Sequence, residues 1–195
     1  FYPKDYNALN ELKECGFHTF AVDHLLKMPL DGNWKNFDDY QNALNTKFRT
    51  KAKATLKRSA AVEVRAASAE DITRYAPILQ RLYENVYEKA DFRLGKLDIR
   101  TLAGLRSRIP ERFKVKLYFI EDKLVGFMSA MRCGQVLEAH VIGIDYDVNR
   151  DFGIYQRMLY DYVDLAIELR CTRIVFGRTA AEIKSTVGAF PVNLT

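Results

Sequence analysis

One stretch of the chain, residues 138–157, most constrains how the protein can fold, because its residue pattern changes abruptly in the middle. The first part is an apolar run with β-branched residues, which favours a strand, and it ends in a polar turn at Asp145. From Gly153 onward, apolar residues recur at helical spacing. The stretch therefore predicts a strand, a turn and a helix. The first N–H groups of a helix are unpaired and lie at the positive end of its dipole, so the turn is a candidate phosphate site; alternatively, Gly153 only lets the backbone turn.

The composition is that of an ordinary globular protein. Of the 195 residues, 48% are hydrophobic and 28% are charged, which predicts one domain with an appendage and excludes a disordered chain. No run of about 18 apolar residues and no leader-like start is present, so we expect neither a membrane span nor a signal peptide. The three cysteines lack metal-site spacing. We therefore expect no metal, buried free thiols and a reducing, cytoplasmic location.

The positive charge is concentrated in one segment of a chain whose formal net charge is +5. The segment contains six basic residues and no acid: Lys47, Arg49, Lys51, Lys53, Lys57 and Arg58. We expect it to lie on a helix that begins at Asn36 or Asp38 and ends near Ser59. Its cations either lie in solvent on an exposed helix face or approach an anionic ligand, and the solvent-exposed face is the more common case.

The chain divides into two parts at the sequence level. Residues 1–35 are difficult to interpret as a compact unit and are predicted to be an N-terminal segment that belongs to a neighbouring domain or forms a subunit contact. Within it, residues 6–15 resemble a short helix, and residues 17–30 resemble extended structure. Residues 36–195 are predicted to form the main domain, with an incomplete last strand.

The order of the remaining elements indicates the fold class. The pattern predicts strands at residues 61–65, 114–120, 124–131, 136–144, 172–176 and 191–195, and helices at residues 68–86, 98–108, 153–169 and 180–187. The three middle strands form a meander, and the helix at 153–169 connects two parallel strands. We therefore predict an α+β (mixed α/β) fold with a mixed, mostly antiparallel sheet flanked by helices, preceded by the basic helix.

This element order and one motif resemble the GNAT-type N-acyltransferases. The family binds acyl-CoA with the signature R/Q-x-x-G-x-G/A at the start of the helix after the fourth strand, and this chain has R-D-F-G-I-Y there. The resemblance implies that the pyrophosphate of acyl-CoA contacts the six residues Arg150, Asp151, Phe152, Gly153, Ile154 and Tyr155. Tyr155 stands where a small residue is usual, which either hinders close approach of the pyrophosphate or suits a different acyl carrier.

Two further stretches resemble the branch of this family that is related to the FemABX peptidoglycan aminoacyl-transferases. They are residues 40–49, and residues 176–178 followed by Glu182-Ile183-Lys184. In many GNAT enzymes a tyrosine four residues before a glycine protonates the departing thiolate. Lys184 lies four residues before Gly188 and is therefore the candidate for that acid, or for a phosphate contact.

Acyl transfer to an amine also needs a base and a group that polarises the thioester carbonyl. Glu138 and His140 lie two apart on one predicted strand, so they face one side; Glu138 is the first candidate base and His140 the second. Alternatively, neither is catalytic: Glu138 is a carboxylate at the rim, and His140 is a hydrogen-bonded structural histidine. The resemblance implies that backbone N–H groups of the same strand hold the thioester, at Val141, Ile142, Gly143 and Ile144.

Three functions stay open at the level of sequence. The leading hypothesis is an N-acyltransferase that moves an acyl group from acyl-CoA to an amine of an unidentified acceptor, without a metal. The first alternative is a FemABX-like transferase that uses aminoacyl-tRNA, in which case the basic helix contacts RNA. The second is a non-catalytic domain that binds an acyl ligand or a protein. The oligomeric state is open and compatible with a dimer.

Overall fold

The computed structural model describes residues 9–18, 22–90, 93 and 95–194. Its centre is a seven-stranded sheet in the order β2-β3-β4-β5-β6-β1-β7. The strands are β1 (Val22–Pro29), β2 (Glu63–Ala66), β3 (Phe113–Ile120), β4 (Lys123–Cys133), β5 (Val136–Ile144), β6 (Arg173–Val175) and β7 (Phe190–Leu194). Neighbouring strands pair antiparallel except for β5 and β6, which are parallel. The predicted mixed, mostly antiparallel α+β fold is confirmed.

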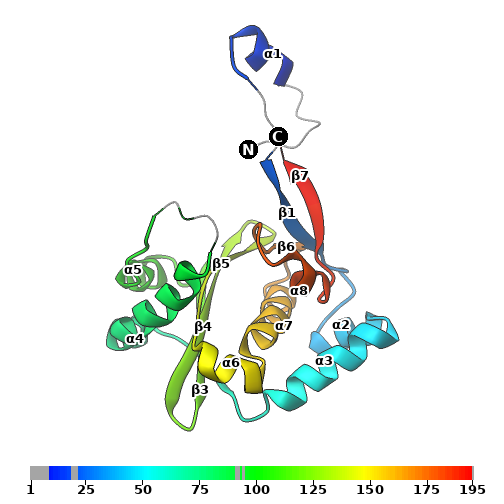
Figure 1. Ribbon diagram of the computed structural model, residues 1–195. Helices are drawn as coiled ribbons and strands as arrows, with labels where there is room; N and C mark the ends of the chain where they lie inside the picture. The colour runs from blue at the N-terminus through cyan, green and yellow to red at the C-terminus, as the bar shows by residue number, and fades with distance from the viewer. Residues whose placement is uncertain (1–8, 19–21, 91–92, 94, 195) are drawn as a thin grey trace.

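Helices cover both faces of this sheet (Figure 1). The described helices are α1 (Leu9–Glu14), α2 (Phe37–Ala43), α3 (Thr46–Arg58), α4 (Ala69–Glu88), α5 (Arg100–Arg108), α6 (Tyr146–Phe152), α7 (Ile154–Glu168) and α8 (Ala181–Ser185). Of these, α1 lies beyond the end of β1 and β7 and covers neither face (Figure 1). In Figure 1, α4 and α5 lie on one side of the β3–β5 part of the sheet, and α7 lies on the other side together with α2 and α3. The two sides enclose separate groups of buried side chains, because the sheet lies between them.

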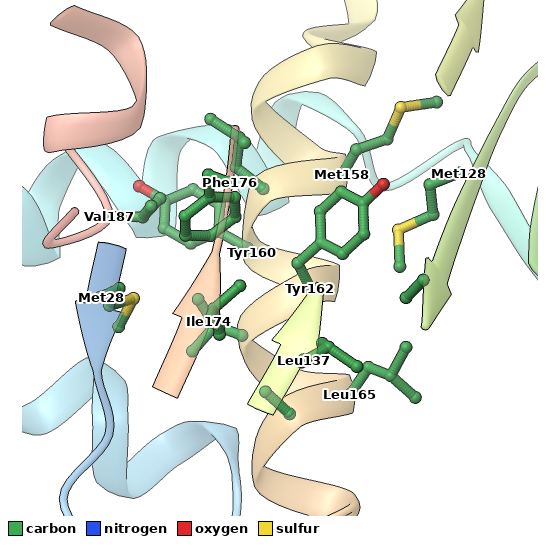
Figure 2. Close-up of a cluster of buried hydrophobic side chains, with 14 of the residues drawn as sticks. Met28, Met128, Leu137, Met158, Tyr160, Tyr162, Leu165, Ile174, Phe176 and Val187 are labelled. Carbon is green, nitrogen blue, oxygen red and sulfur yellow. The ribbon is translucent and has the colours of Figure 1, made fainter. Parts of the chain in front are cut away.

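Helix α7 is the centre of the larger core. Its buried residues occur almost all around the helix, because β4–β6 cover one side and α2, α3 and α8 cover others. Figure 2 shows Met158, Tyr162 and Leu165 of α7 beside Met128 and Leu137 of the sheet. The tyrosines of this helix that the sequence pattern assigned to the core do lie there: Tyr160 and Tyr162 are buried and Tyr155 is partly buried.

The N-terminal segment contributes a strand to the same sheet. β1 lies between β6 and β7 and pairs antiparallel with both. Its Leu26 and Met28 are buried in the larger core. The extended structure predicted at residues 17–30 thus contains β1, but local sequence did not indicate that it belongs to the main sheet, because its partners in β6 lie about 150 residues away. A contact of this segment with a neighbouring domain or subunit stays a prediction. The predicted helix at residues 6–15 is α1, and its first three positions lie outside the described residues.

The single basic helix predicted from residue 36 to residue 59 is wrong; two helices occupy this segment. Asn36 caps α2 as expected, because its side chain accepts a hydrogen bond from the N–H of Asp39. The backbone then becomes extended at Leu44, and the side chain of Asn45 accepts a hydrogen bond from the N–H of Phe48 to start α3. A second N-cap residue in mid-segment therefore outweighs the continuous apolar spacing.

Two other local expectations need correction. The turn predicted between β5 and the long helix is itself a helix, α6, capped by the Asp145 side chain, and α7 begins only after Gly153. The thiols are not all buried, because Cys15 and Cys133 are exposed and only Cys171 is buried.

Candidate active site

The only parallel strand pair in the described sheet opens after three residue pairs. β5 and β6 are in register from Val136 with Arg173 to Glu138 with Val175. Beyond that point β6 ends, and the chain continues to pair only with β1 on its other side, because the N–H of Phe176 donates to the carbonyl of Leu26 and the N–H of Leu26 donates to the carbonyl of Gly177. The edge of β5 from residue 139 to residue 144 is therefore not paired with β6.

A β-bulge in β5 sets which side chains face which side of this opening. Both His140 and Val141 lie opposite Ser129 of β4, where the register shifts by one residue. The Ser129 hydroxyl donates to the Val141 carbonyl at 3.0 Å and accepts from the Val141 N–H at 3.1 Å, so the bulge is pinned by one side chain. His140 packs edge-on against Phe113 on the α4 side, with ring centroids 5.8 Å apart.

The opening is a cleft with a volume of about 510 Å³. Three groups of residues line it. From α4 and the following residues come Tyr83, Val86, Tyr87, Lys89 and Ala90; from β5, α6 and α7 come Ala139, His140, Val141, Ile142, Ile144, Tyr146, Asn149, Tyr155, Leu159 and Tyr162; and from the segment after β6 come Phe176, Gly177, Arg178, Thr179, Ala180 and Lys184.

The cleft brings together about half of the residues singled out from the sequence. The predicted site residues that line it are His140, Val141, Ile142, Ile144, Tyr155 and Lys184. The predicted site residues that do not line it are Glu138, Gly143, Arg150, Asp151, Phe152, Gly153 and Ile154. The first set comes from β5, the start of α7 and α8, and the fold brings α8 back to the two elements that lie close together in the chain.

Lys184 is the most unusual ionisable group in the cleft. It is 6% exposed, and its Nζ donates a hydrogen bond to the carbonyl oxygen of Phe176 at 2.6 Å. No carboxylate of the described residues forms an ion pair with it. Because burial penalises the charged form, the pKa of Lys184 falls to about 8. A lysine with such a pKa can donate or accept a proton near neutral pH.

His140 and Glu138 differ in their surroundings although both lie on the α4 side of β5. Burial lowers the pKa of His140, which favours its neutral ring, and Nδ1 lies 3.1 Å from the Ser129 hydroxyl. Glu138 is half-buried at the last paired position of β5; desolvation raises its pKa, and Arg173 and Lys27 partly oppose the shift. Only His140 reaches the cleft wall.

At Gly143 and at Gly153, other protein atoms fill the space that a Cβ would need. A Cβ at Gly143 would collide with the Phe127 ring and with the backbone of Leu82, so this glycine allows α4 to approach β5 closely. Gly153 adopts the left-handed conformation (φ 62°), ends α6, and has the Arg58 guanidinium directly against it. Its position between α6 and α7 is therefore explained without a ligand.

The start of α7 is partly capped from within the protein. The N–H of Tyr155 donates to the Asn149 side chain at 2.9 Å, so one of the first N–H groups of the helix already has a partner. Arg150 is exposed on α6. Pyrophosphate binding by Arg150 to Tyr155 stays a prediction, and Arg58 is an additional cation at this site that sequence spacing did not indicate.

The sequence interpretation missed several residues of the cleft. Tyr83 and Tyr87 of α4 lie one turn apart and face the cleft, and their spacing of four was a detectable signal. Lys89 and Tyr146 meet across it, with Nζ 3.5 Å from the ring centroid. The Asn85 side chain donates to the Ile144 carbonyl at 3.0 Å, which joins α4 to the end of β5. These contacts link distant segments and had no local signature.

None of the helices in the described part of the chain combines the length and apolar character that a membrane-spanning helix needs. Within the same residues, no group of three or more His, Cys, Asp and Glu side chains is placed to hold a metal ion. The predicted absence of a metal stays a prediction.

Comparison with known proteins supports the fold but does not assign a family by sequence. No protein-family model and no curated protein matches the sequence. The structure is similar to that of FemX, with a TM-score of 0.68 and 15% identity over 95% of this chain and 66% of that chain. It is also similar to the C-terminal domain (DUF2156) of a putative lysylphosphatidylglycerol synthetase from Agrobacterium fabrum (TM-score 0.59, 13% identity, 96% of this chain and 57% of that chain).

A third similar structure is a conserved protein of unknown function from Bacteroides thetaiotaomicron (TM-score 0.61, 11% identity, 96% of this chain and 64% of that chain). The chain therefore spans less than two thirds of each of these three chains. The predicted GNAT-like, FemABX-related fold is confirmed at the level of fold. At these identities, fold likeness does not carry substrate or activity.

Proposed function

We propose that this protein is an N-acyltransferase that uses the cleft between β5 and the segment after β6, with acyl-CoA as donor and an amine as acceptor. The observation that carries the proposal is Lys184, a buried ammonium that faces the cleft near an unpaired strand edge and has no carboxylate partner among the described residues. A buried cation without a counterion is costly, and such groups concentrate at functional sites.

The donor arm would lie along the free edge of β5. Residues 139–144 have one edge that β6 does not pair with, and an extended arm such as pantetheine can hydrogen-bond to such an edge as an added strand would. Backbone N–H groups there would also stabilise the oxyanion of the tetrahedral intermediate. The bulge at His140 and Val141 changes the direction of these groups without breaking the strand.

The reaction needs two proton transfers, and the cleft supplies a group for each. The acceptor nitrogen forms the new C–N bond while the C–S bond of the thioester breaks. The neutral ring of His140 takes the proton that the amine loses, and Lys184 gives a proton to the departing thiolate. Glu138 does not line the cleft, and it is the alternative base, acting through water.

The carrier's phosphates would bind where α3 meets the junction of α6 and α7. Arg58 lies against Gly153 there, and Arg150 is exposed on the adjoining helix. Arginine binds phosphate oxygens in pairs, so the two side chains fit a pyrophosphate even though the Tyr155 N–H is already bonded.

One observation favours a second candidate donor, an aminoacyl-tRNA. The basic residues of α3 continue to Arg58, next to this same junction, and no acid lies within α3. Such a helix suits a long polyanion better than a single cofactor. A non-catalytic binding role, a cytoplasmic location and a dimeric state also stay predictions.

Ligand titrations separate the donors. We expect CoA and acetyl-CoA to bind the wild-type protein and Arg58→Gln to weaken binding about tenfold or more, the loss of one charge-assisted contact. Total tRNA should bind weakly and lose its affinity as salt is raised. If tRNA binds tightly at physiological salt and CoA produces no heat in calorimetry, the second candidate replaces the first.

A turnover assay tests Lys184. With acetyl-CoA and a panel of amines, release of free thiol should fall at least a hundredfold in Lys184→Met, and wild-type turnover should decline as the pH rises above about 8, because the acid is then deprotonated. Circular dichroism must show that the variant is folded. Equal rates in the folded variant and the wild type would remove Lys184 from the mechanism.

A further inference from the structure

The charges that line the cleft are of one sign. Its described lining residues include the cations Lys89, Arg178 and Lys184 and no carboxylate. Two of these cations are engaged: Lys89 lies over the Tyr146 ring and Lys184 holds the Phe176 carbonyl. Arg178 is the third, and none of the described residues accepts a hydrogen bond from its guanidinium or forms an ion pair with it.

We propose that Arg178 determines which acyl group the protein accepts, by binding a carboxylate at the far end of that group. The inference rests on the proposed acyl transfer, and it names the substrate class as a short dicarboxylic acid joined to its carrier through one carboxyl. A guanidinium binds a carboxylate through two parallel hydrogen bonds, which gives direction as well as affinity.

Backbone hydrogen bonds on both sides of Arg178 fix the position of its Cα, from which the side chain extends. Gly177 precedes it with a left-handed conformation (φ 77°), and the Gly177 carbonyl accepts a hydrogen bond from Leu26 of β1. Ala180 follows, also left-handed (φ 57°), and its carbonyl accepts from the N–H of Lys184. Arg178 is half-buried between these anchors. A half-buried arginine without a partner loses hydration that a bound anion would replace.

The position of Arg178 assigns it to the reacting end of the donor and not to the carrier phosphates. It lies two residues after Phe176, whose carbonyl binds Lys184. The cations proposed for the phosphates, Arg58 and Arg150, belong to α3 and α6 and do not line the cleft. Because Arg178 and Lys184 line the same cleft, we expect a thioester beside Lys184 to have the next few atoms of its acyl chain near Arg178.

The same charges act against an acyl group that carries an ammonium. An α-aminoacyl group would bring a positive charge into a cleft that contains three cations and, among its described lining residues, no acid. Repulsion at short range in a partly desolvated space exceeds the repulsion of the same charges in water. The cleft thus favours a dicarboxylic acyl group over a neutral one, and a neutral one over an aminoacyl group.

Three inert donor analogues of equal length test this order. They are N-(2-acetamidoethyl) amides in which nitrogen replaces the thioester sulfur, with a succinyl, a butyryl or a 4-aminobutyryl group. Calorimetric or NMR titration should find the succinyl analogue about tenfold to a hundredfold tighter than the butyryl one, and the 4-aminobutyryl analogue weakest. Arg178→Gln should remove the preference for succinyl and leave butyryl binding unchanged.

The matched control is Arg81→Gln, the same substitution at an exposed position of α4 that does not line the cleft. It should change none of the three affinities. Equal affinities in the wild type, or a succinyl preference that survives in folded Arg178→Gln, would overturn the proposal.

The titration and the turnover assay fail independently. A succinyl preference that depends on Arg178, found in a protein that releases no thiol from any acyl-CoA, would leave the anion subsite and refute acyl transfer. Turnover of acetyl-CoA together with equal binding of the three analogues would support acyl transfer and refute the anion subsite at Arg178.

Discussion

Burial of Lys184 disfavours its charged form, and the resulting cost in folding free energy is measurable as a function of pH. Burial lowers its pKa from 10.5 to about 8 in the folded protein. Between these values the unfolded chain holds a proton that the folded protein has released, so stability rises with pH across this window. Relative to Lys184→Met, the free energy of unfolding of the wild type should increase by about 2–3 kcal/mol from about pH 7 to about pH 10.

Urea unfolding of both proteins at several pH values measures this difference. Other groups titrate in the same range, but they are common to both proteins and cancel in the comparison. Parallel curves for the two proteins would mean that the Lys184 ammonium is better solvated than its burial indicates.

Gly153 is a second residue whose role is testable by itself. Its left-handed backbone disfavours any residue with a Cβ, and a Cβ there would displace the Arg58 guanidinium. We expect Gly153→Ala to lower the free energy of unfolding by about 1–2 kcal/mol, most of it from the backbone, because the end of an arginine side chain can move.

The double variant Gly153→Ala with Arg58→Ala separates the two causes. If the collision contributed little, the double variant should be about as unstable as the sum of the single ones, as measured by denaturant unfolding. A double variant that recovers most of the lost stability would show instead that the collision, and not the backbone, is the main cost.

At the scale of elements, α3 combines good capping with unfavourable charge. Asn45 caps its start and Lys57 and Arg58 lie in its last turn, where cations favour a helix. Within the helix, however, Lys47 and Lys51, and also Lys53 and Lys57, are like-charge pairs one turn apart.

Replacing Lys51 and Lys53 together by Gln should therefore leave the free energy of unfolding within about 0.5 kcal/mol of the wild type, or raise it slightly. If the cations only solvate the helix, donor and RNA affinities should also be unchanged. A several-fold loss of affinity for tRNA, with a smaller salt dependence, would show that α3 contacts a polyanion.

At the scale of the whole molecule, β1 completes the part of the sheet next to the cleft. It lies between β6 and β7, its Leu26 is fully buried, and Leu26 bonds to both Phe176 and Gly177 through the backbone. We expect Leu26→Ala to cost about 2–5 kcal/mol of stability by cavity formation. The segment after β6 should also loosen, because β1 holds it.

Hydrogen exchange and denaturant unfolding check both parts of this expectation. The matched control is Leu56→Ala on α3, a leucine that is only partly buried and should cost less. Equal, small losses for the two variants would indicate that the N-terminal segment is an appendage, as the sequence interpretation had it, and that the domain folds without it.

Most of the secondary structure from residue 60 onward follows from local patterns in the sequence. The alternation in β3 and β4 and the capping residues Ser68 and Asp71 at the start of α4 are local signals, and each acts over a few residues. His140 was named from its position on a predicted strand, whereas Lys184 was named from the resemblance to GNAT enzymes, in which a tyrosine lies four residues before a glycine.

The arrangement of those residues around one cleft depends on contacts between distant parts of the chain. After Val175 the chain stays paired with β1, a strand about 150 residues earlier that has no local signal for this role, whereas its pairing with β5 ends at Glu138. The contact of Arg58 with Gly153 and the position of Arg178 in the cleft likewise depend on packing between distant segments. Local periodicity predicts the individual helices and strands. The site depends on pairing between distant strands, and local sequence patterns do not show the entropy cost of closing the long loops between them.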